Sequence, residues 1–294
     1  KSRLRGVLAL STNNIRASIS AVDKLINSPS STISCFILFT TRPSNSITSI
    51  RELLAITRLS TDCILASNSC GSKGLPRKHL MDLGGKPLIS YSINAALSSN
   101  NLDRTILSTD SEEIRQKSID LGIDAPFLRP AEYATDTSLV FPALRHAIKW
   151  LEEKENYRPD YILLLQAASG VFRTPNDIDN CIDLILNKDA DSVVTYTKAK
   201  QHPYWMKKIV DEGRLEEFIP GTENPANLQR QSLPDVFYPT GFVYVAKTSM
   251  VENQDSFYSN KSYPYFIEQD RAIDIDSLND LLLARLMIES GYEI

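Results

Sequence analysis

Residues 62–78 read DCILASNSCGSKGLPRK, an apolar run of strand length that leads directly into a loop of Ser, Gly and basic residues. The run Cys63–Ala66 predicts a short buried strand. Gly71 and Gly74 let the backbone of the loop approach a ligand closely, and exposed amides in such a loop cradle phosphate oxygens. The Walker A pattern GxxxxGK[ST] is absent, so the loop favours another kind of anion site, with a solvated basic turn as the alternative.

Outward from this stretch, apolar runs alternate with helical patterns. Further strands are predicted at 104–108, 161–165 and 192–196. Helices are predicted from Ser111 to Leu121 before Gly122, over 138–153, after the cap residue Thr174, and from Ser277 to Gly291. This alternation predicts an α/β fold with a mainly parallel sheet and helices on both faces. Ligands of such sheets bind beyond the carboxyl ends of the strands.

Composition excludes several classes of protein. Of the 294 residues, 42% are hydrophobic and 23% are charged, as in an ordinary globular protein and unlike a disordered or collagenous chain. No run of 18 apolar residues occurs, so neither a transmembrane helix nor a membrane partner is expected. The four cysteines form no CxxC pair, which favours reduced thiols and a cytoplasmic location.

The charges divide the chain near residue 61. Residues 1–61 carry eight Lys or Arg and two Asp or Glu, whereas residues 62–294 carry 24 basic and 34 acidic residues. The first part is rich in Ser and Thr, which is typical of an extension or of an organelle-targeting segment, and its role stays open. The acidic second part argues against nucleic acid as a partner.

Ten motifs in the second part occur in one order along the chain. They are GSKGLPRKHL (71–80), LGGKPLI (83–89), STDSEEI (108–114), FLRPAE (127–132), ATDT (134–137), LLQ (164–166), ADSVV (190–194), HPYWMKK (202–208), RQSLP (230–234) and IDID (273–276). Together they resemble the CMP-sialic acid synthetases, the acylneuraminate cytidylyltransferases, over about residues 62–294. The resemblance implies a Rossmann-like nucleotidyltransferase fold, a small dimerisation arm at about 198–239, and a homodimer.

The reaction implied by this resemblance joins CTP to a nine-carbon 2-keto sugar acid and releases pyrophosphate. Such a nucleotidyl transfer needs positioning and charge neutralisation around the phosphates. The resemblance assigns Lys73, Asp274 and Asp276 to catalysis. It assigns nucleotide binding to Asn68, Gly71, Ser72, Lys73, Lys78, His79, Arg129, Thr135 and Gln166, and sugar binding to Gln166, Arg230, Tyr238, Thr240 and Tyr244. Arg230 is the expected partner of the sugar-acid carboxylate, because a guanidinium binds a carboxylate through two parallel hydrogen bonds.

The spacing of Asp274 and Asp276 predicts a metal site. In extended backbone, residues two apart share one face, so both carboxylates face away from the core while Ile273 and Ile275 face it. Mg²⁺, the expected cofactor, prefers a few carboxylate oxygens together with water and phosphate. Capping of the helix after Ser277 is the alternative role for Asp276.

Four departures from the family pattern bear on activity and substrate. Ser69 replaces an arginine that faces the phosphates, so Arg77 or Lys78 is expected to supply that charge, or nucleotide binding is weakened. His79 replaces an asparagine, the segment 166–173 has one additional residue, and Tyr238–Phe242 differs where the sugar is expected. A legionaminic- or pseudaminic-type acid therefore fits as well as sialic acid. The alternatives are a degenerate, non-catalytic or regulatory homologue and a CMP-Kdo-type synthetase, the latter disfavoured by the segments HPYWMKK and RQSLP.

Overall fold

A computed structural model describes residues 59–67, 75–135, 138–220 and 229–292. The chain divides into two units, 1–59 and 60–294. Residues 1–58 lie outside the described ranges, so the predictions for the N-terminal extension stay predictions. The second unit includes Ser60, whose backbone N–H donates to Asp160 Oδ2 at 2.9 Å, so this unit begins just before the division predicted near residue 61.

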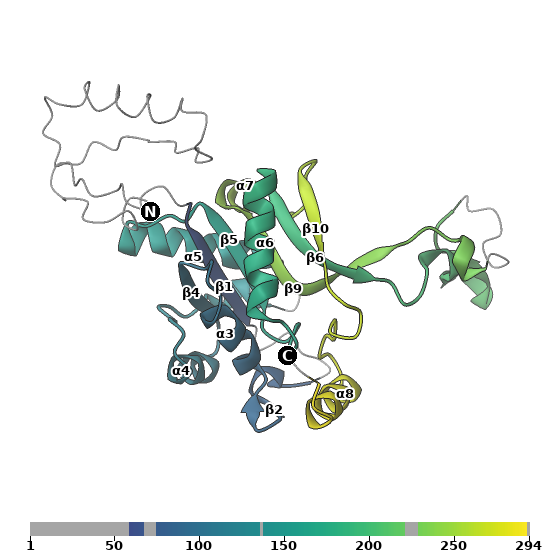
Figure 1. Cartoon of the computed structure of the whole chain (residues 1–294), viewed down its shortest axis with the longest axis horizontal. Helices are drawn as coiled ribbons and strands as arrows, with labels where there is room; N and C mark the ends of the chain where they lie inside the picture. The colour runs from purple at the N-terminus through teal and green to yellow at the C-terminus, as the bar shows by residue number, and fades with distance from the viewer. Residues whose placement is uncertain (1–58, 68–74, 136–137, 221–228, 293–294) are drawn as a thin grey trace, which may run out of the picture. The chain divides into compact units, whose positions relative to one another are not determined.

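A six-stranded sheet forms the centre of the second unit (Figure 1). In spatial order its strands are β10 (Ser262–Phe266), β6 (Ser192–Lys198), β9 (Phe237–Lys247), β5 (Tyr161–Gln166), β1 (Thr61–Ser67) and β4 (Arg104–Thr109). The pairs β10/β6, β5/β1 and β1/β4 are parallel, and only β9 runs against its neighbours β5 and β6. The predicted strands at 63–66, 104–108, 161–165 and 192–196 are therefore all present in a mainly parallel sheet, whereas β9 was not predicted.

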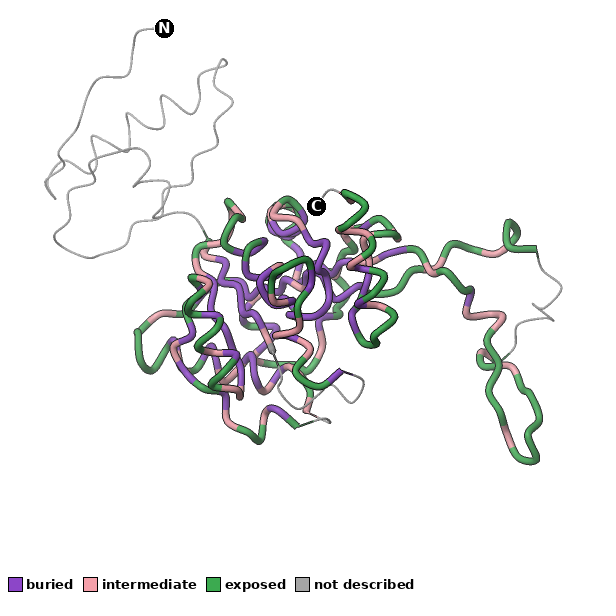
Figure 2. Tube along the Cα trace, turned by 90° about the horizontal axis from the view of Figure 1, so that it is seen from below, coloured by how far each residue is buried: buried purple, intermediate pink, exposed green. Residues whose placement is uncertain are grey.

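Helices cover both faces of the sheet, as predicted. On one face α3 (Ile89–Leu97), α4 (Glu112–Asp120) and α6 (Pro175–Lys188) bury apolar residues against the strands. On the other face lie α5 (Val140–Glu155) and α7 (Thr248–Asn253). Buried positions concentrate in this layered region, whereas the arm is mostly exposed (Figure 2). Among the described residues, no helix is both long enough and apolar enough to cross a membrane.

The helix boundaries follow local capping chemistry. Thr174 caps α6 in a capping box with Asp177, and Ser277 caps α8 (Leu278–Glu289) in the same way with Asp280. Gly122 takes a φ of 92° just after α4, the left-handed geometry expected of a glycine at that position. Helix α5 begins at Val140 and ends at Glu155, two residues later at each end than predicted.

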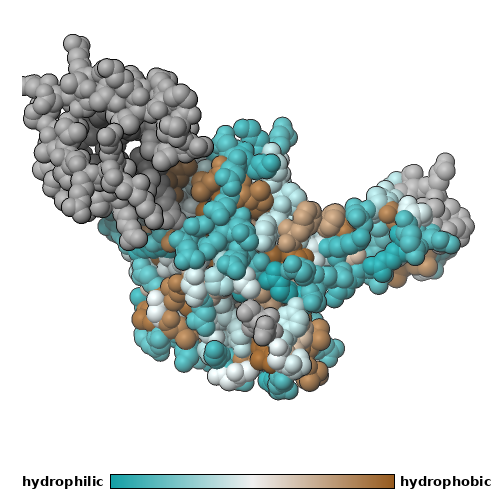
Figure 3. All heavy atoms as spheres, in the orientation of Figure 1, coloured by the Kyte–Doolittle hydropathy of each residue, from teal (hydrophilic) through white to brown (hydrophobic). Residues whose placement is uncertain are grey.

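Two smaller features leave the main sheet. The short strands β2 (Asp82–Leu83) and β3 (Lys86–Pro87) form a hairpin beside α8, where a third apolar cluster includes Leu83, Ile273 and Ile275. The predicted arm contains a second hairpin, β7 (Lys207–Ile209) with β8 (Leu215–Glu217), and extends away from the sheet (Figure 1). Hydrophobic residues are visible at its base and over α8 (Figure 3).

Candidate active site

Polar residues of the predicted site gather at the carboxyl edge of the sheet. Gln166 is the last residue of β5, and Asp110 directly follows β4. Strand β1 ends at Ser67 on the same edge, but the residues that follow it, 68–74, lie outside the described ranges. The predictions for Asn68, Ser69, Gly71, Ser72 and Lys73 therefore stay predictions.

Asp274 and Asp276 have the predicted alternation. Ile273 and Ile275 are buried, and both aspartates are exposed. The segment is extended but is no regular strand, because Asp274 forms only an isolated antiparallel bridge with Ser169. Ser169 Oγ lies 2.9 Å from Asp274 Oδ1, which accepts its hydrogen bond.

Lys78 is the cation that faces this carboxylate pair. Its ammonium lies 2.9 Å from Asp276 Oδ1 and also donates to the carbonyl of Ile275 at 3.1 Å. The two carboxylates thus have one hydrogen-bond donor each, from Ser169 and Lys78. Ser277 and Asp280 cap α8. The carboxylate of Asp276 therefore does not have the capping role that was its alternative assignment from the sequence.

The electrostatics of the pair suit a divalent cation. Loss of water around Asp274 raises its pKa, and repulsion from Asp276 adds to the rise, while Ser169 and Lys78 oppose it. No group of three or more His, Cys, Asp and Glu side chains that could hold a metal occurs within the described ranges. Two carboxylates that leave room for water and phosphate oxygens are the donor set that Mg²⁺ prefers, so these residues fit the predicted ion.

A buried group of ionisable residues adjoins Lys78. Arg129 is 3% exposed, and its Nη2 lies 3.4 Å from Asp110 Oδ1. His79 is buried close to both, and burial lowers its pKa to about 4, helped by the nearby charges of Lys78 and Arg129. His79 is therefore neutral near pH 7 and binds other groups only as a neutral imidazole.

Gln166 is held beside the carboxylate pair through Ser169 and Gly241. Ser169 Oγ lies 3.1 Å from Gln166 Oε1 as well as near Asp274, so its single hydrogen can serve either acceptor. Gly241 has a φ of 73°, and a Cβ there would come within 2.8 Å of both Gln166 Oε1 and the Ser169 side chain. Glycine is thus required at 241 for β9 to pass this close to the site.

Arg173, the last residue of the segment 166–173 and without a predicted role of its own, holds the same region together. Its side chain is fully buried, and burial lowers its pKa to about 10. Nη2 donates to the carbonyls of Ser169 at 2.6 Å, Gln166 at 3.2 Å and Gly241 at 3.3 Å, and Nη1 donates to Ser92 Oγ at 2.9 Å. The additional residue before Arg173 indicated that this loop differs from the family pattern. It did not indicate that the Arg173 guanidinium is buried against the carbonyls of the loop.

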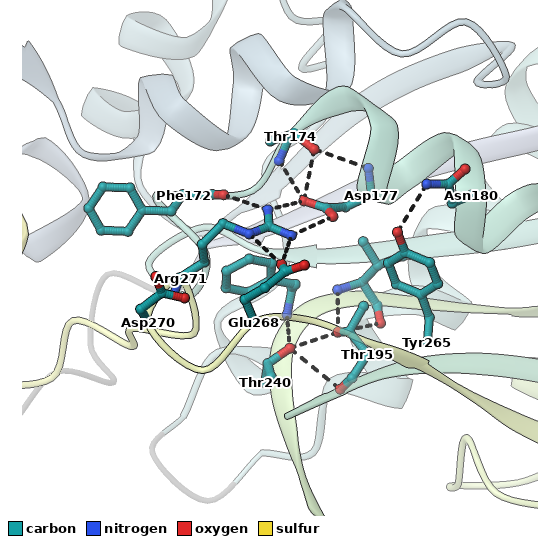
Figure 4. Close-up of polar contacts among 12 residues, drawn as sticks. Phe172, Thr174, Asp177, Asn180, Thr195, Thr240, Tyr265, Glu268, Asp270 and Arg271 are labelled. Carbon is teal, nitrogen blue, oxygen red and sulfur yellow. Dashed lines mark hydrogen bonds and ion pairs between the residues drawn. The ribbon is translucent and has the colours of Figure 1, made fainter. Parts of the chain in front are cut away.

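The residues predicted to bind the sugar are not all gathered at this edge. Thr240 is buried, and its hydroxyl lies 2.9 Å from Thr195 Oγ1 between strands β9 and β6 (Figure 4), which places it inside the sheet. Tyr244 is partly buried against Phe257, and burial raises its pKa, with Asp274 among the charges that contribute. Tyr238 is exposed at the start of β9.

Among the described residues, Arg230, Thr135 and Arg77 form no hydrogen bond or ion pair with the carboxylate pair. Arg230 lies exposed in the 3₁₀ turn Arg230–Ser232 of the arm. Thr135 Oγ1 lies 2.6 Å from Ser138 Oγ. Arg77, one of the two candidates to replace the missing arginine, is ion-paired with Glu113, while the other, Lys78, is directed to Asp276.

The strand order is that of an α/β protein, and basic residues and exposed carboxylates lie together beyond the carboxyl edge of the sheet, where such folds bind their ligands. The chain belongs to the cytidylyltransferase family, whose model matches residues 69–217. This confirms the resemblance found in the sequence.

Curated relatives agree with this assignment. The chain is 31% identical over 224 residues to the CMP-N,N'-diacetyllegionaminic acid synthase of Legionella pneumophila, covering 76% of this chain and 94% of the relative. It is 28% identical to the N-acylneuraminate cytidylyltransferase of Streptococcus agalactiae over 75% of this chain, but spans only about half, 51%, of that relative. The pseudaminic acid cytidylyltransferase of Campylobacter jejuni is 26% identical, with 79% and 97% covered.

Solved structures confirm the predicted fold. A CMP-2-keto-3-deoxy-manno-octonic acid synthetase complexed with CTP has a TM-score of 0.57 at 14% identity, with 79% of this chain and 99% of that chain covered. A 4-diphosphocytidyl-2C-methyl-D-erythritol synthase from Anaerococcus prevotii has a TM-score of 0.55 at 13% identity, with the same coverage. At these identities the likeness concerns the fold alone.

Proposed function

We propose that this protein is a cytidylyltransferase that joins CTP to a nonulosonate sugar acid. The observation that carries the proposal is the pair Asp274 and Asp276 beside Lys78 at the carboxyl edge, in a chain of the cytidylyltransferase family. In the reaction, the anomeric hydroxyl oxygen of the sugar bonds to the α-phosphorus of CTP. The bond from that phosphorus to the bridging oxygen breaks, pyrophosphate leaves, and the hydroxyl proton is released to solvent.

The residues of the site divide this work between them. Asp274 and Asp276 would hold Mg²⁺, which when bound supplies positive charge to the phosphates. Lys78 reaches the same edge and offers a second cation. Gln166, fixed by Ser169 and Gly241, orients the reacting sugar or nucleotide, while buried Arg129 and neutral His79 lie beside Lys78 as further candidates for nucleotide binding.

The names of the relatives support a nonulosonate as the acceptor. They include acylneuraminic, legionaminic and pseudaminic acid enzymes at comparable identity, so the class of sugar acid is better supported than any one member. Tyr244 and Gln166 are the proposed contacts on the body of this chain, and Arg230 on the arm is the proposed partner of the sugar carboxylate.

We also propose a homodimer formed through the arm. The hairpin exposes Ile209 (76%) and Leu215 (69%), and Phe218 follows it at 60% exposure. At the base of the arm, an open groove of about 260 Å³ is lined mainly by aromatic residues, among them Tyr196, Phe237, Tyr258, Tyr263 and Phe266. Exposed apolar area of this kind is typical of a surface that another chain covers. A partner seated there would also explain how Arg230 of one protomer reaches sugar bound to the other.

Light scattering on two variants tests the dimer. Ile209→Asp combined with Leu215→Asp should give a monomer, because each aspartate would be desolvated in the contact. Leu97→Asp, at a residue 48% exposed on α3, is the matched control and should stay dimeric. A double variant that remains dimeric would show that the arm is not the contact.

The cytoplasm is the proposed compartment. Cys63 and Cys181, the two described cysteines, are buried and free, and burial raises the pKa of both thiols. Inert reduced thiols of this kind suit a reducing compartment. Cell fractionation followed by immunoblotting tests the proposal, and recovery in an organelle would contradict it.

Pyrophosphate release from CTP tests the activity directly. The purified protein should release pyrophosphate in the presence of Mg²⁺ with at least one of N-acetylneuraminic, legionaminic and pseudaminic acids, and not with 2-keto-3-deoxy-manno-octonic acid. Pyrophosphate release with 2-keto-3-deoxy-manno-octonic acid alone would show that the protein is a CMP-Kdo-type synthetase. No release with any acid would favour the regulatory homologue, for which the serine at 69 is the supporting feature.

A further inference from the structure

The segment that carries the two aspartates has little regular structure of its own. It links β10, which ends at Phe266, to α8, which begins at Leu278. Its backbone contacts with the loop 168–170 are long, at 3.5 Å both from the Gly170 N–H to the Ile273 carbonyl and from the Ile275 N–H to the Ala168 carbonyl. Hydrogen bonds of this length are weak. The position of Asp274 and Asp276 therefore depends on other contacts.

Arg271 supplies the strongest of these contacts (Figure 4). Its guanidinium binds both oxygens of Asp177, at 2.8 Å and 3.0 Å, and donates twice to Glu268 Oε2, at 2.6 Å and 2.8 Å. Nη1 also donates to the carbonyl of Phe172 at 3.3 Å. All five N–H groups of the side chain are thus used, which fixes the guanidinium in both position and orientation.

The partner of Arg271 is itself fixed. Asp177 is only 4% exposed at its side chain, and Arg271 is 16% exposed. Asp177 Oδ2 also accepts hydrogen bonds from the backbone N–H of Thr174 at 2.8 Å and from its hydroxyl at 2.9 Å, within the capping box of α6. Arg271 is therefore bound to the rigid first turn of a helix rather than to a mobile surface side chain.

The same turn begins directly after Arg173, which holds the carbonyls of Gln166 and Ser169. The chain of contacts runs from Arg271 through Asp177 and Thr174 to Arg173, and from there to the loop that bears Gln166. Ser169, in that same loop, hydrogen-bonds Asp274. The segments 166–177 and 268–276, about 100 residues apart, are therefore joined at two points, by Arg271 with Asp177 and by Ser169 with Asp274.

We propose that Arg271 is a positioning residue that sets the distance between the carboxylates Asp274 and Asp276 and the loop of Gln166. The inference rests on the proposed function, in which those carboxylates hold the divalent cation. Arg271 lies three residues before Asp274 and touches neither substrate nor metal in this assignment. Loss of a side chain that hydrogen-bonds a metal ligand commonly changes metal affinity by about 10- to 100-fold. Arg271 bonds neither carboxylate and acts through the backbone that leads to Asp274, so the lower end of that range is expected.

Binding of Mn²⁺ in the presence of CTP and without sugar acid tests the proposal, because no turnover occurs. Free Mn²⁺ is followed by electron paramagnetic resonance. Arg271→Ala should weaken Mn²⁺ binding about tenfold, and Arg271→Lys, which keeps the charge but not the paired geometry, should weaken it by a smaller factor. Asp177→Asn provides a second route, because asparagine keeps the cap of α6 but loses the ion pair.

Arg158→Ala is the matched control for lost stability. Arg158 also binds two carboxylates, Glu152 at 3.1 Å and Glu252 at 2.6 Å, but it precedes β5 and so lies at the opposite edge of the sheet. It should lower the unfolding midpoint without changing Mn²⁺ affinity. Hydrogen exchange should quicken in residues 268–277 of Arg271→Ala and stay unchanged there in Arg158→Ala.

Asp274→Asn distinguishes failure of the proposed metal site from failure of the proposed role of Arg271. If Asp274→Asn abolishes Mn²⁺ binding while Arg271→Ala, Arg271→Lys and Asp177→Asn leave it unchanged, Arg271 is only a stabilising residue and the inference is wrong. If Asp274→Asn itself leaves Mn²⁺ binding unchanged, the proposed metal site is wrong and the inference falls with it. If Arg271→Ala does not fold, the other two variants decide.

Discussion

Among the residues that the structure describes, two carboxyl groups have raised pKa values, and their surroundings differ. Asp274 lies at the edge of the sheet beside Asp276, where a cation would reverse the effect on its pKa. Asp62 is fully buried in β1, where it accepts a hydrogen bond from the Tyr157 hydroxyl at 2.8 Å, and burial raises its pKa to about 6. The first group belongs to the proposed chemistry, whereas the second affects only stability.

Asp62→Asn should change how stability depends on pH. The pKa of about 6 in the folded protein lies above the ordinary value of 3.8 for aspartate, so burial penalises the ionised form and stability falls as the pH rises from about 4 to above 6. Between pH 5 and pH 7.5 the wild type should lose about 1.5 kcal/mol more of its free energy of unfolding than Asp62→Asn. Urea unfolding at both pH values measures the difference, and parallel pH profiles would contradict the assignment.

Asp274→Asn and Asp276→Asn should each lower turnover at least about a hundredfold, because each removes an anchor for the divalent cation. Both should remain folded by circular dichroism. Asp280→Asn is the control, since Asp280 caps α8 from the same segment and asparagine can still accept those hydrogen bonds. Near-normal turnover of the first two variants at limiting Mg²⁺ would show that the metal lies elsewhere.

At the scale of elements, side-chain caps mark the starts of α4, α6 and α8. The capping box of α6 matters most, because its Asp177 serves the helix and Arg271 together. Asp177 therefore both stabilises α6 and binds the segment that is proposed to hold the metal.

Thr174→Ala should destabilise the protein by about 1 kcal/mol, the usual effect of losing a helix cap. Thr174→Ser keeps the hydroxyl and should stay within a few tenths of a kcal/mol of the wild type. Denaturant unfolding compares the two. Equal losses for both variants would show that the threonine methyl group, rather than the cap, is the stabilising feature.

Local pattern was enough to predict four strands of the six-stranded sheet, but not β9 or β10. The strands β1, β4, β5 and β6 and the caps Thr174 and Ser277 follow from runs and spacings of a few residues. Strand β9 contains Pro239 and Gly241, which are typical of a loop. It is a strand because its two neighbours, β5 and β6, satisfy its backbone hydrogen bonds, and that pairing joins segments distant in sequence.

The same limit applies to the candidate site. The alternation around Asp274 and Asp276 predicted their shared face correctly, because period two is a local property. The inward turn of Arg173 and the ion pair of Arg271 with Asp177 could not be predicted, because each depends on partners supplied by other segments. Thr240 likewise faces Thr195 because of how β9 pairs with β6.

At the scale of the whole molecule, the second unit contains every described residue of the proposed site. Its apolar clusters include residues from Cys63 onward. The family match begins at residue 69, within this unit.

Deletion of residues 1–58 should therefore leave turnover of CTP within a few fold and leave the dimer intact. Steady-state pyrophosphate release and light scattering on the shortened and full chains make the comparison. Loss of the soluble dimer on deletion would show instead that the first unit packs against the second.

The position of β9 has a consequence for the order in which this molecule can assemble on the ribosome. Strands β5 and β6 are made 26 residues apart, yet they are not neighbours, because β9 (Phe237–Lys247) lies between them. Until β9 emerges, the edges of β5 and β6 that face it stay unpaired, and open strand edges are where other chains add and aggregate. Strand β10 also follows β9 along the chain, so premature termination within the arm would leave the paired strands β5, β1 and β4 and a separate β6 with nothing to join them.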